Sequence, residues 1–269
     1  MDLTGKHVVV TGGSQGIGAA LATEFADRGA RVLVAARSEE KLREVAAPIV
    51  GDHLVADLSG AADVDTFVDR CLDVLGHIDV FVNNAGIETS TSFATTDRDQ
   101  LRTLARLNFE GTVLLTRDVL DHMLERGSGH IVQMSSVAGA IPFPGLAAYA
   151  GTKAGITNFT ETLRLELKRT DIGLTVVSPG PTDTEMWDRL ETDERPFVGV
   201  GLQRFKRLGF LPKLSAEQIA SATVDAVERS KRFVRLPRRY DGYHMLSNAP
   251  RRLVEGALLG TRFPKDWEK

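Results

Sequence analysis

The 269-residue chain has a single cysteine, Cys71, no long uninterrupted apolar run and no excess of positive charge. One cysteine cannot close a disulfide within the chain and has no partner for a cysteine-based metal site, which favours a reducing compartment. The formal net charge of −3 predicts no nucleic-acid partner. The six histidines lack the spacing of metal ligands, so we expect no bound metal.

Signals for membrane targeting are also missing. The first ten residues, MDLTGKHVVV, lack the basic end and the long apolar stretch of a secretion signal. Residues 127–152 contain no Asp, Glu, Lys or Arg and are long enough to cross a bilayer, but Pro142, Pro144 and several glycines rule out a continuous apolar helix there. We therefore expect a cytoplasmic protein without a transmembrane segment.

What the chain does contain is a repeated alternation of strand-like and helix-like segments. Its length and its 42% of hydrophobic residues suit one α/β domain covering residues 1–269. Short β-branched runs are separated by stretches with helical spacing, two of them with Ser38 and Ser59 as expected helix caps. The pattern predicts an α/β fold, a doubly wound parallel sheet of about seven strands with helices on both faces. The strands are expected at residues 7–11, 31–35, 53–56, 80–83, 130–134, 174–178 and 233–236.

The charge is divided unevenly along the chain. Residues 1–195 contain 18 Lys and Arg against 29 Asp and Glu, whereas residues 196–269 contain 15 against 7. A basic C-terminal extension, about residues 237–269, could contact anionic lipid at a membrane surface. The interpretation we favour is a solvated cap that pairs with the acidic body or with a neighbouring subunit.

The first predicted strand runs into a glycine-rich turn and then a helix, through residues 11–18 with the sequence TGGSQGIG. Glycines permit a tight turn and let a diphosphate approach the backbone at the helix N-terminus. The turn lacks the Gly-Lys-Ser/Thr ending of a P-loop, which argues against a P-loop nucleotidase. An ordinary glycine-rich connection is the alternative that these residues alone leave open.

Tyr149 and Lys153 are four residues apart, which on a helix places both side chains on one face. A free phenol has a pKa of about 10, and a nearby ammonium favours the phenolate. Lys153 can therefore bring Tyr149 toward a pKa that is useful for proton transfer. Taken alone, such a pair would more often be a surface contact.

Several motifs in a fixed order make the chain resemble the short-chain dehydrogenase/reductase family over about residues 5–236. Ser136 precedes Tyr149 by 13 residues, as in the family. The resemblance implies a Rossmann fold and an NAD(P)-dependent oxidoreductase that interconverts a ketone or aldehyde with an alcohol. The motifs are Thr-Gly-x-x-x-Gly-x-Gly at 11–18, Asn-Asn-Ala-Gly at 83–86, Asn108, Ser136, Tyr149-x-x-x-Lys153 and Ser-Pro-Gly at 178–180.

The resemblance implies a catalytic role for each of four residues. Tyr149 would act as general acid and base toward the substrate oxygen, and Ser136 would hydrogen-bond that oxygen. Lys153 would tune Tyr149 and bind the nicotinamide ribose, and Asn108 would support a proton relay to Lys153. Ser135 is the neighbouring alternative to Ser136, and the 13-residue spacing favours Ser136.

The choice of nicotinamide cofactor is expected to depend on the residues after the second strand. An acidic residue there would bind the adenosine ribose hydroxyls, whereas an arginine would accept a 2′-phosphate. This chain has Arg37 and Ser38 and no acid at that point, so we expect NADP(H) to be preferred over NAD(H). Two considerations oppose this: Arg37 could be an ordinary exposed residue, and NADP-preferring relatives often have Lys or Arg where this glycine turn has Gln15.

The resemblance assigns further cofactor contacts to residues on four segments. Asp57 would meet the adenine, although it could instead begin a helix cap. Thr184 would meet the nicotinamide carboxamide, with Thr182 as the alternative. Together with Arg37, Ser38, Tyr149 and Lys153, the expected contacts are Gly12, Ser14, Gln15, Gly16, Ile17, Gly18, Asp57, Leu58, Asn84, Ala85, Gly86, Pro179, Gly180, Thr182 and Thr184.

The family builds its substrate pocket after the catalytic serine and in the loop after the sixth strand, here about residues 181–213. Val137, Phe143, Met186 and Trp187 would suit a medium or large hydrophobic carbonyl compound or alcohol, unless the aromatic residues are ordinary core. By analogy we expect a homodimer or homotetramer. The rival interpretations are a non-catalytic, cofactor-binding regulatory or scaffold protein, and a lyase or epimerase on the same fold.

Overall fold

The computed structural model describes residues 1–185, 207 and 213–237. Within them, seven parallel strands form one sheet in the order β3-β2-β1-β4-β5-β6-β7. All seven lie where the hydrophobic runs predict them, with ends that differ by at most two residues. The strands are β1 (His7–Thr11), β2 (Arg31–Ala36), β3 (Asp52–Val55), β4 (Val80–Asn83), β5 (Gly129–Met134), β6 (Ile172–Pro179) and β7 (Phe233–Leu236).

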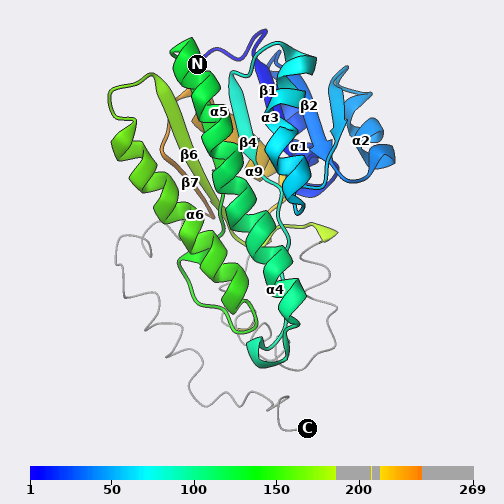
Figure 1. Ribbon diagram of the computed structural model, residues 1–269, viewed down its shortest axis with the longest axis vertical. Coiled ribbons are helices and arrows are strands. Elements are labelled where there is room, and N and C mark those ends of the chain that lie inside the picture. Colours follow the sequence, from blue (N-terminus) through cyan, green and yellow to red (C-terminus); the bar gives the residue numbers. More distant parts are fainter. Residues whose placement is uncertain (186–206, 208–212, 238–269) are drawn as a thin grey trace.

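Helices cover both faces of the sheet, as Figure 1 shows. One face carries α1 (Gly16–Asp27), α2 (Glu39–Ala46) and α9 (Ala216–Glu228). The other carries α3 (Ala61–Leu75), α5 (Thr112–Arg126) and α6 (Ala147–Glu166). The predicted doubly wound Rossmann arrangement is therefore confirmed. The shorter segments are η1 (Phe93–Thr95), α4 (Arg98–Ala105), η2 (Arg106–Gly111) and η3 (Val137–Gly139).

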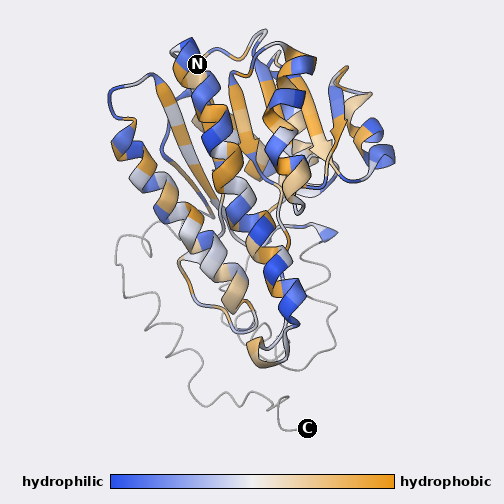
Figure 2. Ribbon diagram, in the orientation of Figure 1, coloured by the Kyte–Doolittle hydropathy of each residue, from blue (hydrophilic) through white to orange (hydrophobic). Residues whose placement is uncertain are grey.

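The strands are almost continuously apolar because the sheet buries side chains on both faces. In β1, Val8 and Val10 pack into the core against α1, while Val9 between them packs into the core on the other face. Successive residues of a strand point to opposite faces, so a strand covered by helices on both sides has no polar face. The orange colour of the central strands in Figure 2 shows the same pattern.

Of the two expected helix caps, Ser38 is present and Ser59 is not, and Ser215 supplies a further cap. Ser38 caps α2 by accepting a hydrogen bond from the Lys41 amide, and Ser215 caps α9 in a reciprocal pair with Gln218. Ser59 does not cap α3, because that helix begins at Ala61 with Gly60 as its N-cap. The Ser59 hydroxyl donates instead to the Asp57 carboxylate at 2.7 Å, a stronger acceptor because it is charged.

The strand order places a crevice at one edge of the sheet. From β1 the chain continues outward to β2 and β3, then crosses back to β4 on the other side of β1. The connections leaving β1 and β4 therefore diverge at their carboxyl ends, which is where ligands bind in open α/β sheets. In the described part of the chain, no helix is both long enough and apolar enough to span a membrane.

Candidate functional site

The glycine-rich turn after β1 is packed against the segment that follows β4. Gly12 and Gly16 have φ of +64° and +54°, values that favour glycine. A Cβ on Gly12 would lie 2.8 Å from the Ala85 Cα, and one on Gly18 would lie 2.1 Å from the Gly12 carbonyl oxygen. A side chain at Gly12 would therefore displace the segment after β4, and one at Gly18 would displace the glycine-rich turn itself.

The N-terminus of α1 opens directly from this turn. Its N-cap, Gln15, makes no side-chain capping bond, and the first turn of the helix contains no acidic residue. Unsatisfied amides at a helix start, backed by the helix dipole, suit a diphosphate. Ser14 and Ile17 flank this position, Ile17 packing against the core. The turn thus fits the nucleotide cofactor that the motif predicts.

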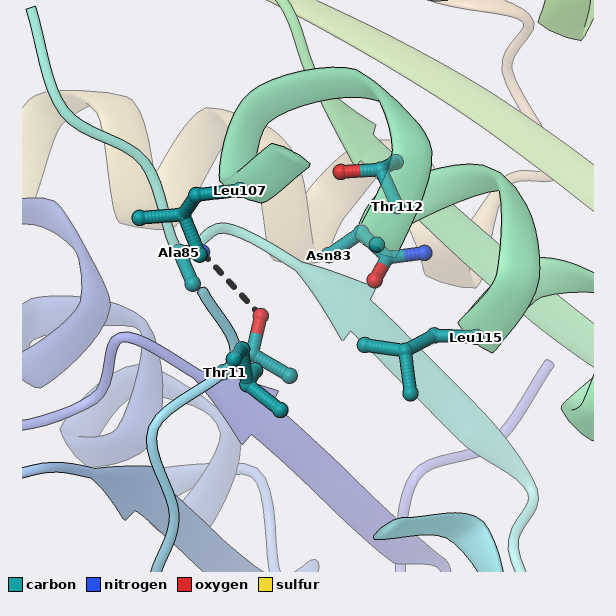
Figure 3. A pocket seen from close by; sticks show the side chains of 8 residues that line it. Thr11, Asn83, Ala85, Leu107, Thr112 and Leu115 are labelled. Atoms are coloured by element: carbon teal, nitrogen blue, oxygen red, sulfur yellow. Dashed lines mark hydrogen bonds between the residues drawn. The ribbon is translucent and has the colours of Figure 1, made fainter. Parts of the chain in front are cut away.

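The Asn-Asn-Ala-Gly motif after β4 ties this strand to β1. The Asn84 side-chain amide donates to the carbonyl oxygens of Thr11 (2.9 Å) and Gly12 (3.2 Å). The Thr11 hydroxyl accepts from the amides of Asn84 and Ala85, the second of which Figure 3 draws. Asn84 and Ala85 therefore hold the glycine-rich turn in shape. Gly86 lies deeper in the site, where a Cβ would be 3.2 Å from Asn108 Oδ1 and 3.5 Å from Lys153 Nζ.

Tyr149 and Lys153 lie on the first two turns of α6, beside the end of β5. The Lys153 side chain is buried, and its Nζ donates to the Met134 carbonyl oxygen at 2.8 Å. The same Nζ is 5.7 Å from the centre of the Tyr149 ring. Ser136 begins η3 just after β5, and its hydroxyl accepts from the Ala138 amide at 3.2 Å. The predicted Ser, Tyr and Lys therefore come together at the carboxyl edge of the sheet.

Burial shifts the pKa values of both α6 residues away from those in water. It raises the pKa of Tyr149 to about 12, since the phenolate is poorly solvated there; a hydrogen bond from Ser136 lowers it, and the charge of Glu88 raises it further. Burial lowers the pKa of Lys153 to about 8. At neutral pH this gives a protonated phenol beside an ammonium that is costly to keep charged.

The hydroxyl of Ser135, the alternative to Ser136, is already hydrogen-bonded to residues of α6. Its hydroxyl donates to the Lys153 carbonyl oxygen at 2.9 Å and lies 2.8 Å from the Thr157 hydroxyl. The residue is almost completely buried. Ser135 therefore anchors the helix that carries Tyr149, and Ser136 is the one placed to hydrogen-bond the phenol.

Asn108 lies in η2, a single π-helical segment between α4 and α5, and such segments are frequent at functional sites. Its side chain clamps Ile87, accepting from the Ile87 amide at 2.9 Å and donating to the Ile87 carbonyl oxygen at 2.7 Å. It also donates to the Thr152 hydroxyl at 3.4 Å, one residue from Lys153. Asn108 thus joins the segment after β4 to α6.

The residues expected at the adenosine end lie after β2 and β3. Arg37 and Ser38 are exposed at the start of α2. The pKa of Asp57 is lowered, first by the Ser59 hydroxyl and also by the amide of Ser59 and the charge of Arg37, while burial opposes them. Leu58 is buried in the core rather than exposed to a ligand.

The segment after β6 closes the crevice from the other side. Gly180 donates to the Leu236 carbonyl oxygen, and Pro179 ends the strand. The buried Thr182 donates its hydroxyl to the Gly180 carbonyl oxygen at 3.0 Å. Thr184 reaches the glycine-rich turn, its Cγ2 lying 3.2 Å from where a Cβ on Gly16 would be. Thr184 therefore faces the turn more directly than Thr182.

Two of the four residues expected to contact substrate can be placed. Phe143 packs with Tyr149 in a small apolar cluster around Ala138 and Leu146, and Val137 lies in η3 beside them. The other two, Met186 and Trp187, lie outside the described residues, as do most of the loop at 181–213 and the extension at 237–269.

A second hollow lies behind the crevice, and Figure 3 shows it from close by. Thr11, Asn83, Thr112 and Leu115 are among the side chains that line it, and it is too small to hold a water molecule. It is therefore a packing defect between β1, β4 and α5 and not a substrate pocket. Among the described residues, no group of three His, Cys, Asp or Glu could hold a metal ion.

Two charged residues near the site carry no motif signal. Lys41, on α2, lies 3.0 Å from the Gln15 amide oxygen of the glycine-rich turn. Glu88, two residues after the Asn-Asn-Ala-Gly motif, is close enough to Tyr149 to raise its pKa. The sequence places Lys41 three residues after Ser38, but only the folded chain brings it to the turn.

Comparison with known proteins agrees with this geometry. The family model described as short chain dehydrogenase matches residues 6–195. An uncharacterized oxidoreductase of Staphylococcus epidermidis is 34% identical, over 82% of this chain and 90% of that protein. A Sesamum indicum protein named 11-beta-hydroxysteroid dehydrogenase A is 37% identical, over 88% of this chain and 69% of its own.

Solved structures show the same fold with nicotinamide nucleotides bound. A short chain dehydrogenase from Burkholderia cenocepacia in complex with NADP has a TM-score of 0.76 and 27% identity, covering 87% of this chain and 97% of that one. A short chain dehydrogenase/reductase from Burkholderia phymatum in complex with NAD has a TM-score of 0.80 and 23% identity, covering 91% and 94%, a likeness of fold.

Proposed function

Since the chain belongs to the short-chain dehydrogenase/reductase family, we propose that it is an oxidoreductase interconverting a ketone or aldehyde with an alcohol, with NADP(H) preferred. The observation that carries the proposal is the meeting of Ser136, Tyr149 and Lys153 at the carboxyl edge of the sheet, beside a turn that suits a dinucleotide. The nicotinamide cofactor would supply or accept the hydride.

Tyr149 is the proton donor and acceptor in this proposal. With its pKa raised to about 12, the phenol is protonated at neutral pH and can donate to a carbonyl oxygen as that oxygen gains charge. Ser136 would hydrogen-bond the same oxygen. In the oxidative direction Tyr149 must first lose its proton, and the ammonium of Lys153 favours this loss.

Lys153 and Asn108 would support the tyrosine. The Lys153 Nζ bonds only one carbonyl oxygen in the described residues, so donors remain for the nicotinamide ribose. Asn108 holds Ile87 and Thr152 around this ammonium and would pass protons toward it through water. Gly12 lies against Ala85 and Gly16 against Thr184, which supports a single cofactor site between the glycine-rich turn, the Asn-Asn-Ala-Gly motif and the segment after β6.

The preference for NADP(H) rests on charge at the end of β2. That strand ends in Ala36, so no carboxylate is present there to repel a 2′-phosphate, and Arg37 and Ser38 follow at once. The charge of Arg37 contributes to lowering the pKa of Asp57, which supports a position for Arg37 at the expected adenosine end of the crevice.

A hydrophobic substrate is the second part of the proposal. Phe143 and Tyr149 pack against the same small apolar cluster, Ala138 and Leu146, so the reacting oxygen would lie near an apolar surface. The name 11-beta-hydroxysteroid dehydrogenase of several relatives, among them that from Sesamum indicum, points to substrates of the same apolar kind. By family analogy the enzyme would work as a homodimer or homotetramer.

A screen of carbonyl compounds with NADPH and NADH, and of alcohols with NADP and NAD, followed at the absorbance of the reduced nicotinamide, tests the proposal. We expect turnover of hydrophobic carbonyls and loss of at least about 10²-fold in Tyr149→Phe. Turnover in none of the pairs would favour the non-catalytic scaffold. Turnover of short polar carbonyls alone would contradict the hydrophobic substrate.

Arg37→Asp tests the cofactor preference separately. We expect the ratio of kcat/KM for NADPH to that for NADH to reverse, because a carboxylate repels the 2′-phosphate and accepts the ribose hydroxyls. Arg43→Asp, in the last turn of α2, is the matched control and should leave the ratio within about twofold. An unchanged ratio in Arg37→Asp would refute the assignment.

A further inference from the structure

The side chain of Lys41 crosses from α2 to the two segments that border the crevice. Its Nζ lies 3.0 Å from the Gln15 amide oxygen in the glycine-rich turn and 3.5 Å from a carboxylate oxygen of Glu185 after β6. These residues are far apart in the sequence, and only the carboxyl edge of the sheet brings them together. Lys41 is therefore a positive charge held at the turn by a neutral partner, Gln15, and beside it by an exposed carboxylate, Glu185.

Lys41 and Arg37 both lie close to Ser38. The Lys41 amide donates to the Ser38 hydroxyl, so Lys41 lies in the first turn of α2, and its side chain extends toward Gln15. Arg37 directly precedes Ser38 and is exposed, and its charge contributes to lowering the pKa of Asp57, after β3. An anion beside Ser38 would consequently lie near two cations.

Resting on the proposed preference for NADP(H), we propose that Lys41 is a second cation for the 2′-phosphate of the cofactor. The glycine-rich turn has Gln15 where a basic side chain would otherwise reach this phosphate, and Gln15 in turn holds the ammonium of Lys41 there. A phosphate dianion offers several charged acceptors, which two cations from different segments can share. Gln15 then supports the preference by positioning Lys41.

Glu185 competes for the same ammonium. Its side chain is 59% exposed and that of Lys41 is 47% exposed, so water screens their pair and its contribution is small. A phosphate carries up to twice the charge of a carboxylate and would take Lys41 from Glu185, while the contact with Gln15 can persist. Glu185 therefore sets how tightly the phosphate is held without touching it.

Binding of two nucleotides that differ only in this phosphate tests Lys41. We expect Lys41→Gln to weaken 2′,5′-ADP about tenfold in a calorimetric titration and to leave 5′-AMP within about twofold. Arg43→Gln removes an equal charge from the same helix, where Arg43 is exposed and pairs with Glu39, and should leave both nucleotides within about twofold. Equal weakening of both nucleotides by Lys41→Gln, or of neither, would overturn the assignment.

Glu185→Gln gives the opposite effect in the same assay. Removing the competing carboxylate should tighten 2′,5′-ADP about two- to threefold in the wild-type background and leave it unchanged in Lys41→Gln. An equal gain in both backgrounds would show that Glu185 acts by simple repulsion and would overturn the competition. Thermal melting checks that each variant is folded.

Arg37→Asp separates the two levels of the proposal. If wild type prefers 2′,5′-ADP over 5′-AMP and Arg37→Asp abolishes this while Lys41→Gln does not, the NADP(H) preference stands and the role of Lys41 is wrong. If wild type shows no preference between the two nucleotides, the proposed cofactor preference itself fails and the role of Lys41 fails with it.

Discussion

The two edges of the sheet each bury a charged side chain, and they treat it in opposite ways. At the amino edge the carboxylate of Asp79, before β4, is surrounded by cations. At the carboxyl edge the ammonium of Lys153 is as deeply buried, and among the described residues it has no carboxylate within ion-pair distance. A buried charge is expensive unless it is paired, so the two edges differ in how that cost is met.

Asp79 is fully compensated by its neighbours. Burial alone would raise its pKa, but the amide of His7 and the charges of Lys6, His77 and Arg126 together lower it. The carboxylate accepts from the His7 amide at 2.9 Å and lies 3.5 Å from Lys6, 3.3 Å from Arg126 and 3.1 Å from the imidazole of His77. This edge is therefore organised for stability.

Lys153 is left uncompensated, and its pKa falls to about 8 through burial alone. The ammonium is held beside Tyr149 by one carbonyl oxygen, which costs stability and keeps its other donors available. The contrast shows that the unpaired buried charge lies at the carboxyl edge, where we propose the active site. This agrees with the tendency of perturbed pKa values to gather at functional sites.

Lys153→Met should give the largest effect and separate activity from stability. We expect kcat/KM to fall about 10²- to 10⁴-fold, because Tyr149 loses the charge that favours its phenolate and the ribose loses a donor. The melting temperature should not fall, since an apolar side chain of similar length removes the cost of a buried cation. Lys168→Met, at an exposed position just after α6, is the control for both measurements. A large loss of stability with little loss of activity would reverse the comparison.

Asp79→Asn should lower stability and leave activity almost unchanged. We expect the free energy of unfolding to fall by about 2–3 kcal/mol, because the cations and the His7 amide lose a charged acceptor, while kcat/KM stays within about twofold. Chemical denaturation followed by circular dichroism measures the first quantity. Asp52→Asn, whose more exposed carboxylate pairs with Arg31, should cost less than about 1 kcal/mol. Equal losses in the two variants would show that burial of Asp79 is unimportant.

Lowering the pH should first reduce the stability of the amino edge, through protonation of His130 at the start of β5. Burial lowers the pKa of His130 to about 4, below its ordinary 6.5, so the unfolded chain binds more protons between these values. The contribution of His130 to the free energy of unfolding is fully present above pH 6.5 and is lost as the pH falls toward 4. The loss amounts to about 2 kcal/mol between pH 7 and 5.

The His130→Gln variant measures that contribution. Its unfolding free energy should fall less between pH 7 and 5 than that of wild type, with a residual slope from His77 and His122, whose pKa values are also lowered. His53→Gln, on the edge strand β3, should keep the wild-type slope. If the slopes of both variants match wild type, the histidine does not carry the acid sensitivity.

Much of the fold could be predicted because parallel strands covered on both faces must be apolar throughout. The runs ending in Thr11 and Asn83 therefore stand out in the sequence, and the helix between Gly16 and Asp27 follows from its glycine-rich entry and its spacing. The prediction that Ser59 caps a helix was wrong, because a contact outside the local pattern decided its hydrogen bond. Its place before a helical run suggests a cap, but its hydroxyl donates a hydrogen bond to the neighbouring Asp57 carboxylate instead.

The sequence by itself determined the family and the local geometry of the candidate site. The four-residue spacing of Tyr149 and Lys153 places them one helix turn apart wherever that helix lies, and glycine at position 12 allows a positive φ that other residues rarely adopt.

Only the tertiary structure decided which groups meet across the crevice. Lys41 reaches Gln15 and Glu185, and Asn108 clamps Ile87 from a π-helical turn, through contacts between segments that are distant in the sequence. Burial is likewise a property of the packed chain: it lowers the pKa of Lys153, whereas at Asp79 the amide of His7 and nearby charges outweigh it. The reason is that local spacing follows from covalent geometry, whereas desolvation and long-range contacts arise only when the sheet and its helices assemble.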